Sequence, residues 1–142
     1  MSGSTVGQMT DSTDRRRAQL GAAGEQLAAE HLTRRGFEIV ERNFRTRWGE
    51  LDIIAAQHRT IVFCEVKTRV ARIVARAAEV NGWDPLESVH ARKQAKVRRM
   101  AAQWLVERRE RPRADDLRFD AIGVTVDSAG RLLRLDHLEG AF

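Results

Sequence analysis

The sequence has few residues that could build covalent or zinc chemistry. Its 142 residues include one cysteine, Cys64, which excludes an internal disulfide and a cysteine-rich zinc site. Because Cys64 lies inside an apolar run, we interpret it as a small core residue. The histidines do not follow a metal-ligand spacing, and we expect all four on the surface or in loops: His31, His58, His90 and His137. A thiol or histidine enzyme is therefore disfavoured.

Long apolar runs are also missing. No stretch approaches the roughly 20 apolar residues that a membrane-spanning helix needs. Residues 1–14 are rich in Ser, Thr, Gly and Asp, and they lack the apolar region of a signal peptide. We therefore predict a disordered N-terminal tail over 1–14, a single domain over 15–142, and a cytoplasmic protein with no membrane partner.

The charge balance favours an anionic partner. The formal net charge is +5, and the sequence pI is about 10.5. Such a balance is typical of proteins that bind nucleic acid or anionic surfaces, although a solvated basic surface gives the same count. The sequence contains no helix-turn-helix or zinc-finger pattern. If the partner is nucleic acid, this favours recognition of its structure over recognition of its base sequence.

The spacing of apolar residues predicts an α/β domain, with a mixed sheet flanked by helices. Two helices are expected, over 15–35 and 89–109. Strands are expected at 37–43, 49–54, 61–67, 117–126 and 132–138, with a linker at 55–60. Residues 70–80 alternate Arg with Ala and Val, which suits either a loop or a marginal helix. The cluster 81–85 predicts a turn, with Asp84 as a helix cap.

The strands at 49–54 and 61–67 contain three charged residues among apolar ones: Asp52, Glu65 and Lys67. Charged side chains in a buried strand are costly unless they have a partner or a function. Because side chains alternate along a strand, Glu65 and Lys67 point to the same face. Antiparallel pairing of the two strands would bring Asp52 close to them. The sequence thus predicts two carboxylates and an ammonium at one edge of the sheet.

This cluster suits metal-dependent hydrolysis of a phosphodiester. Asp52 and Glu65 are the predicted ligands of Mg²⁺ or Mn²⁺, since Mg²⁺ prefers oxygen donors and typically uses one or two carboxylates. Lys67 is predicted to orient the attacking water or to stabilise developing negative charge. Glu25 begins the buried face of the first helix and is a fourth candidate. The alternative is an ordinary sheet in which Glu65 and Lys67 form an ion pair, with Glu25 exposed on its helix.

Two groups of basic residues are candidates for phosphate contacts. On the second helix, Arg92, Lys96 and Arg99 share one face by their spacing, and Lys93 near its start could also reach the metal site. Three arginines flank the charged strands: Arg45, Arg47 and Arg69. The alternative is a solvated basic face. Trp48 is a candidate for stacking on an unpaired base, although packing at the rim of the core is the more ordinary role.

Several sequence blocks resemble a known family. They are Gly24-Glu25 with Ala28, Asn43-Phe44-Arg45, Gly49 to Ile54 and Val62 to Arg69, together with Arg92-Lys93-Gln94, Arg118-Phe119-Asp120 and Ala141-Phe142. These blocks resemble the YraN-type family of uncharacterised bacterial proteins, and the resemblance spans most of residues 20–142. That family looks like a member of the PD-(D/E)XK nuclease superfamily and is similar to archaeal Holliday-junction resolvases.

The resemblance implies a restriction-endonuclease-like fold and a Mg²⁺ site. The superfamily signature maps onto Asp52, Glu65 and Lys67, and Glu25 matches the helix glutamate of the resolvase-like branch. Residues 70–84 depart from the family, in which we expect a shorter glycine-containing link. We therefore expect an endonuclease that acts on branched or discontinuous DNA, as a monomer or a homodimer. The alternatives are an inactive nucleic-acid-binding module of the same fold and a protein-interaction subunit.

Overall fold

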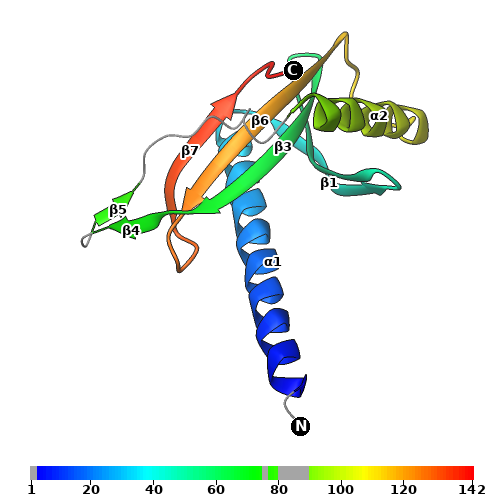
Figure 1. The fold of residues 1–142 in the computed structure, drawn as a ribbon. Coiled ribbons are helices and arrows are strands. Elements are labelled where there is room, and N and C mark those ends of the chain that lie inside the picture. The colour runs from blue at the N-terminus through cyan, green and yellow to red at the C-terminus, as the bar shows by residue number, and fades with distance from the viewer. Residues whose placement is uncertain (1–2, 75–76, 80–89) are drawn as a thin grey trace.

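The computed structural model describes residues 3–74, 77–79 and 90–142 of the chain. In chain order, its elements (Figure 1) are α1 (Gly3–Arg34), β1 (Glu38–Thr46), β2 (Gly49–Gln57), β3 (Thr60–Val70), β4 (Arg72–Val74), β5 (Ala77–Glu79), α2 (Ala91–Glu107), β6 (Asp116–Val126) and β7 (Leu132–Leu138). Within the described ranges, no helix combines the length and the apolar composition needed to cross a membrane.

One mixed sheet contains most of the strands, in the order β1-β2-β3-β6-β7. β3 and β6 run parallel, and every other neighbouring pair in this sheet is antiparallel. A parallel pair needs a crossover between its strands, and α2 lies in the connection from β3 to β6. The predicted α/β class with a mixed sheet is confirmed, and the arrangement is consistent with a restriction-endonuclease-like architecture.

The two helices pack against different parts of the core, because successive residues of β3 face opposite sides of the sheet. Val62 and Cys64 pack with α1 in one buried cluster, and Ile61 and Phe63 pack with α2 in another. Trp104 of α2 is fully buried, and its ring meets Phe63 edge-on at 5.8 Å between centroids. Burial of a side chain of this size contributes roughly 2 kcal/mol or more. The interpretation of Cys64 as a core residue is confirmed.

α1 begins earlier than the sequence predicted. Residues 3–14, expected to belong to a disordered tail, are part of this helix (Figure 1). The segment contains no proline, and extending an existing helix adds one hydrogen bond per residue without a new nucleation step. Side chains from 12 to 19 are exposed, whereas Ala28 and Leu32 are fully buried. The C-terminal half of α1 is therefore the part that packs on the sheet and positions the site.

The hairpin between β2 and β3 is tighter than the sequence predicted. Both strands are longer than expected, so the linker over 55–60 shrinks to a turn of His58 and Arg59. These residues have positive φ angles of 50° and 62°, as a two-residue type I′ turn requires. The turn sets the register that pairs Ile53 with Cys64.

A second, small sheet replaces the loop or marginal helix predicted for 70–80. There, β4 pairs with β5 in an antiparallel hairpin. The dipeptide Ile73-Val74 is β-branched, which favours extended backbone over helix. The turn predicted over 81–85, with its cap Asp84, lies outside the described residues. The second helix begins at Ala91, close to the predicted start.

Candidate active site

The candidate site lies where β2 separates from β3. The ladder of paired residues between these strands ends at Ile53 and Cys64, whereas β3 stays paired with β6 as far as Val70. Beyond the end of the ladder, the backbone N–H of Val66 donates a hydrogen bond of 2.8 Å to Oδ2 of Asp52. The carboxylate thus takes the place of a backbone acceptor in the gap between the strands. The predicted approach of Asp52 to the charged part of β3 is confirmed.

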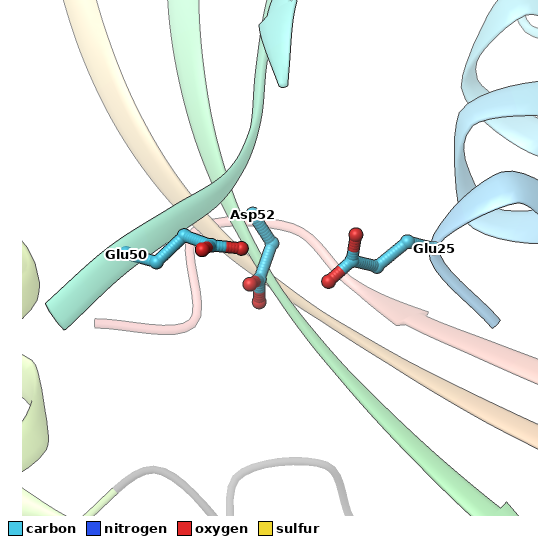
Figure 2. Close-up of side chains that lie close together, drawn as sticks. All are labelled: Glu25, Glu50 and Asp52. Carbon is cyan, nitrogen blue, oxygen red and sulfur yellow. The ribbon is translucent and has the colours of Figure 1, made fainter. Parts of the chain in front are cut away.

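Two more carboxylates meet Asp52 in this gap. Glu25 reaches it from α1, and Glu50 precedes it by two residues on β2 (Figure 2). One carboxylate oxygen from each of the three residues lies within 4.8 Å of the others. We call these residues the acidic cluster. Glu50 was not among the predicted site residues, although strand alternation places it on the same face as Asp52 and could have identified it.

Asn43 links two members of the acidic cluster. When its amide is oriented to satisfy its neighbours, the nitrogen donates to Oε2 of Glu25 at 2.9 Å and to Oε1 of Glu50 at 2.7 Å. Asn43 has a left-handed backbone with φ of 57°, a conformation that asparagine adopts more readily than most residues. This side chain therefore fixes the two glutamates relative to each other. Sequence reasoning gave Asn43 no role.

Gly24 explains how Glu25 reaches the acidic cluster. A Cβ atom built at Gly24 would lie 1.8 Å from Oγ1 of Thr68 on β3. Only glycine allows the backbone of α1 to approach the strand this closely. The next residue along the helix is Glu25, so the contact with Thr68 carries its carboxylate to Asp52. The pair Gly24-Glu25 thus acts as one unit in building the site.

The acidic cluster brings carboxyl groups close together in a half-buried place. Burial, followed by the charge of Glu65, raises the pKa of Asp52 from 3.8 to about 8. Burial likewise raises the pKa of Glu25, and the neighbouring Glu50 adds to this effect. Oxygen donors held close together in this way are the ligands that hard divalent cations prefer. The residues present therefore fit a Mg²⁺ or Mn²⁺ ion.

Glu65 is not one of these three carboxylates, although its charge contributes to the raised pKa values of Asp52 and Glu25. Its side chain is buried, and Oε1 forms an ion pair of 2.9 Å with Nζ of Lys93 from α2. Burial raises the pKa of Glu65, and the ammonium groups of Lys93 and Lys67 oppose that rise. The structure thus places Lys93 at the site, as the sequence suggested. It brings Asp52 together with Glu25 and Glu50, while the other predicted ligand is held by a lysine.

Two hollows flank the acidic cluster. One has a volume of about 450 Å³, and Glu25 lines it together with the exposed Lys67. The other has a volume of about 350 Å³ and lies between the β1–β2 turn and α2, where Glu50 and Glu65 line it. Lys67 and Glu65 therefore border different hollows, with the cluster between them.

The predicted phosphate contacts occupy varied surroundings. Arg92, Lys96 and Arg99 are exposed on α2. The three arginines that flank the charged strands each have a partner: Arg45 is 3.4 Å from Glu50, Arg47 lies 4.5 Å from the ring centroid of Trp48, and Arg69 donates to Thr125 at 3.3 Å. The exposed basic face of α2 is thus the part of this set best placed to meet a polyanion.

Two of the four histidines correct a prediction. His137 was expected on the surface, but its side chain is 3% exposed, and Nε2 lies 2.8 Å from Oδ2 of the buried Asp120. His31 was also expected on the surface; it is half-buried on α1, with its ring 3.0 Å from that of His137. The reason is that a buried carboxylate needs donors, and these side chains extend its hydrogen-bond network. His58 and His90 are exposed, as predicted.

Comparison with known proteins places the chain among relatives of similar length. The model of an uncharacterised protein family, UPF0102, matches residues 24–124. A UPF0102 protein of Frankia casuarinae is 44% identical over 124 residues, which cover 87% of this chain and 95% of the relative. A UPF0102 protein of Mycobacterium tuberculosis is 45% identical over 129 residues, with 87% and 92% covered. The match to the family model includes the acidic cluster and all of α2.

Proposed function

The chain belongs to the UPF0102 family, and we propose that it is a divalent-metal-dependent nuclease that acts on DNA with junctions, flaps or other discontinuities. The observation that carries this proposal is the acidic cluster, in which Glu25, Glu50 and Asp52 bring carboxylate oxygens within 4.8 Å of one another. These three residues are half-buried, and half-buried carboxyl groups with raised pKa values, such as those of Asp52 and Glu25, are characteristic of a functional site. The YraN-type resemblance of the sequence, confirmed at the level of the family, supports the same proposal.

The acidic cluster would hold the cation. Asp52 is the central ligand in this proposal, because its carboxylate faces both glutamates and is fixed by the N–H of Val66. The predicted pairing of Asp52 with Glu65 as ligands requires Glu65 to exchange Lys93 for the ion. When bound, a divalent ion would polarise the scissile phosphate and lower the pKa of a water molecule.

Lys67 would act on the side of the cluster that faces the larger hollow. Its side chain is exposed and lines that hollow together with Glu25. An ammonium group at this place can orient a water molecule or stabilise negative charge on the phosphate oxygens. Because Lys67 is on the same strand as Glu65, its position is fixed by the sheet rather than by a loop.

The exposed face of α2 would hold the DNA backbone. Arg92, Lys96 and Arg99 offer three positive charges on that face. Contacts of this kind bind phosphates without reading base sequence. This supports a substrate chosen by its structure, and DNA with discontinuities exposes backbone in shapes that a regular duplex lacks.

One observation favours a second candidate, a nucleic-acid-binding module without catalysis. The ion pair between Lys93 and Glu65 neutralises a carboxylate that the nuclease signature assigns to the metal. If this pair persists when DNA binds, one predicted ligand is lost. The basic face of α2 would still bind DNA in that case.

The test is cleavage of single-stranded, duplex, flap and four-way-junction DNAs in Mg²⁺ or Mn²⁺. The wild type is compared with Asp52→Asn and with Asp115→Asn, a control carboxylate that is exposed and paired with Arg59. We expect metal-dependent products from the wild type and the control, and a loss of at least about a hundredfold in Asp52→Asn. Binding without products in all three proteins would favour the inactive module. Absence of binding would overturn both readings.

A further inference from the structure

The smaller hollow has features that cleavage chemistry does not require. It lies between the turn that joins β1 to β2 and the start of α2, and its volume is about 350 Å³. This is within the range of small-ligand sites. Glu50 and Glu65 line the side that adjoins the acidic cluster, and Trp48 lines the side formed by the turn.

Trp48 is held in place by the turn that carries it. Its backbone N–H donates to Oγ1 of Thr46 at 3.1 Å, and that hydroxyl donates to the carbonyl of Gly49 at 3.0 Å. The sulfur of Met100 lies 3.9 Å from where a Cβ atom of Gly49 would be, so the turn rests close to α2. The guanidinium of Arg47 lies over the indole ring, 4.5 Å from its centroid. The indole is therefore oriented before any ligand arrives.

The rest of the hollow combines an apolar base with a basic rim. Val97 and Met100 of α2 are buried and line it with apolar atoms. Arg92 and Lys96 of the same helix also line it, and both remain exposed. A planar group with apolar faces, joined to a negatively charged chain, matches this combination of an aromatic ring, apolar side chains and cations.

We propose that this hollow holds one unpaired nucleobase, stacked on Trp48, next to the phosphate that the acidic cluster cleaves. The inference rests on the proposed nuclease function and names its substrate more closely: DNA with an unstacked nucleotide at the cleavage point. Arg92 and Lys96 then contact the phosphates that flank this nucleotide. A continuous duplex cannot fill the hollow, because its bases are stacked and paired with one another.

The test measures binding in the absence of divalent cations, so that no cleavage is needed. Two duplexes are compared that differ at one position, where the bulged nucleotide is either 2-aminopurine or an abasic residue. We expect the base-containing duplex to bind about tenfold more tightly, since stacking on an aromatic side chain has an effect of this order. We also expect the 2-aminopurine fluorescence to fall on binding. Equal affinity for the two duplexes would overturn the proposal.

Two substitutions separate stacking from packing at the rim of the core. Trp48→Phe keeps an aromatic plane, and it should retain most of the preference for the base. Trp48→Leu keeps apolar volume without that plane, and it should bind both duplexes alike. A Trp48→Leu protein that folds normally and keeps the full preference would assign Trp48 to packing and overturn the stacking role. Thermal unfolding of each variant confirms that the fold is retained.

The failure of this proposal is distinguishable from failure of the proposed function. A preference for the base that depends on Trp48, without cleavage in Mg²⁺, supports the nucleobase site and removes the catalytic claim. Metal-dependent cleavage without any preference for the base supports the catalytic claim and removes the nucleobase site. Absence of DNA binding overturns both.

Discussion

Asp52 and Asp120 lie on the strands at either side of β3, and they differ in what surrounds their carboxylates. Asp120 is fully buried. It accepts hydrogen bonds from the guanidinium of Arg118 at 2.8 Å and 2.9 Å and from the N–H of Gly140 at 3.0 Å, and His137 lies 2.8 Å away. Burial opposes its ionisation, but these donors together hold the pKa of Asp120 below its usual value.

Asp52 is in the opposite situation. It accepts the N–H of Val66, but the charges that face it include the carboxylates of Glu65 and Glu25, and its pKa rises to about 8. A buried charge with donors stabilises the fold, whereas a buried charge among like charges weakens it. Burial of an aspartate is therefore not by itself a functional signal. The charge of the neighbouring groups separates a structural carboxylate, which faces donors and cations, from a candidate ligand, which faces other carboxylates.

The largest change in stability should come from substituting Asp120. Asp120→Asn takes the negative charge away from Arg118 and His137, so we expect the free energy of unfolding to fall by about 3 kcal/mol. In the metal-free protein, Asp52→Asn should leave the free energy of unfolding unchanged or raise it, because the substitution removes a carboxylate that Glu65 and Glu25 repel. Urea unfolding of the two variants beside the wild type measures both. Equal losses of stability in the two variants would mean that Asp52 also stabilises the fold, and the proposed difference between Asp52 and Asp120 would be wrong.

The sequence predicted the charged residues around Asp52 better than it predicted the hydrogen-bond partners of Asp120. Asp52, Glu65 and Lys67 stand out locally, since each interrupts an apolar run, and alternation relates the last two. The network of Asp120 joins side chains of β6 and β7 to the backbone of Gly140, and no local sequence pattern marks His137 and Gly140 as partners of this carboxylate.

Parts of the candidate site were also beyond local reasoning. The pairing of Glu65 with Lys93 depends on how α2 packs on the sheet, which helix periodicity does not determine. Asn43 stands out in the sequence only as part of the Asn43-Phe44-Arg45 block, because nothing in the sequence shows that its backbone is left-handed. Glu50 is different: it follows the same alternation as Asp52, but a glutamate at the start of a strand is ordinary. The fold class and the central residues were thus predictable, while the partners were not.

A smaller loss of stability, together with weaker cleavage, should follow from moving α1 relative to the acidic cluster. Gly24→Ala places a methyl group 1.8 Å from Oγ1 of Thr68, so the helix must shift and Glu25 with it. We expect a loss of about 2 kcal/mol in unfolding free energy, together with weaker cleavage. Gly21→Ala is the matched control on the same helix, because its added Cβ meets nothing within 4 Å. It should stabilise the protein by roughly 0.5–1 kcal/mol.

The outcome of the Gly24 experiment also depends on Thr68. Combining Gly24→Ala with Thr68→Ala removes the hydroxyl and the methyl group nearest the new side chain. Part of the lost stability should return in the double variant, as expected for residues in contact. If Gly24→Ala proves as harmless as Gly21→Ala, the close approach of α1 to β3 would not be what delivers Glu25 to the site.

The contribution of Asp52 to stability should depend on pH and on divalent metal. In the folded protein the pKa of Asp52 is raised from 3.8 to about 8, so between these pH values the folded state keeps a proton that the unfolded chain has already lost. The contribution of Asp52 to stability therefore falls as pH rises through this window. The advantage of Asp52→Asn over the wild type in unfolding free energy should accordingly grow with pH across this window.

Divalent metal should reverse that advantage. Mg²⁺ or Mn²⁺ bound by the acidic cluster would stabilise the wild type by mass action, and Asp52→Asn would gain less. Unfolding by urea across the pH window, with and without the metal, measures both effects. An advantage that is independent of pH, or a metal effect that is the same in both proteins, would argue that Asp52 neither titrates in this window nor binds the ion.

The smallest effect per residue, on DNA affinity, is expected from the basic residues. Like the two aspartates, they differ in their surroundings: one kind is half-buried and ion-paired, and the other is exposed. Arg118 is held by Asp120, whereas Arg92, Lys96 and Arg99 are exposed on α2. Changing these three to Ala together should reduce the slope of log affinity for DNA against log salt by about 2 to 3, as each lost phosphate contact lowers it by roughly one.

A second triple variant tests whether position or total charge decides this result. Arg113, Arg131 and Arg134 are exposed at other places on the surface, and changing them to Ala removes the same number of charges. We expect this control to keep the salt slope close to that of the wild type, because diffuse charge is screened over about 10 Å at moderate ionic strength. If both triples flatten the slope equally, binding follows net charge and α2 is not a docking face. If only the α2 triple does so, the DNA backbone lies beside the hollow that Trp48 lines.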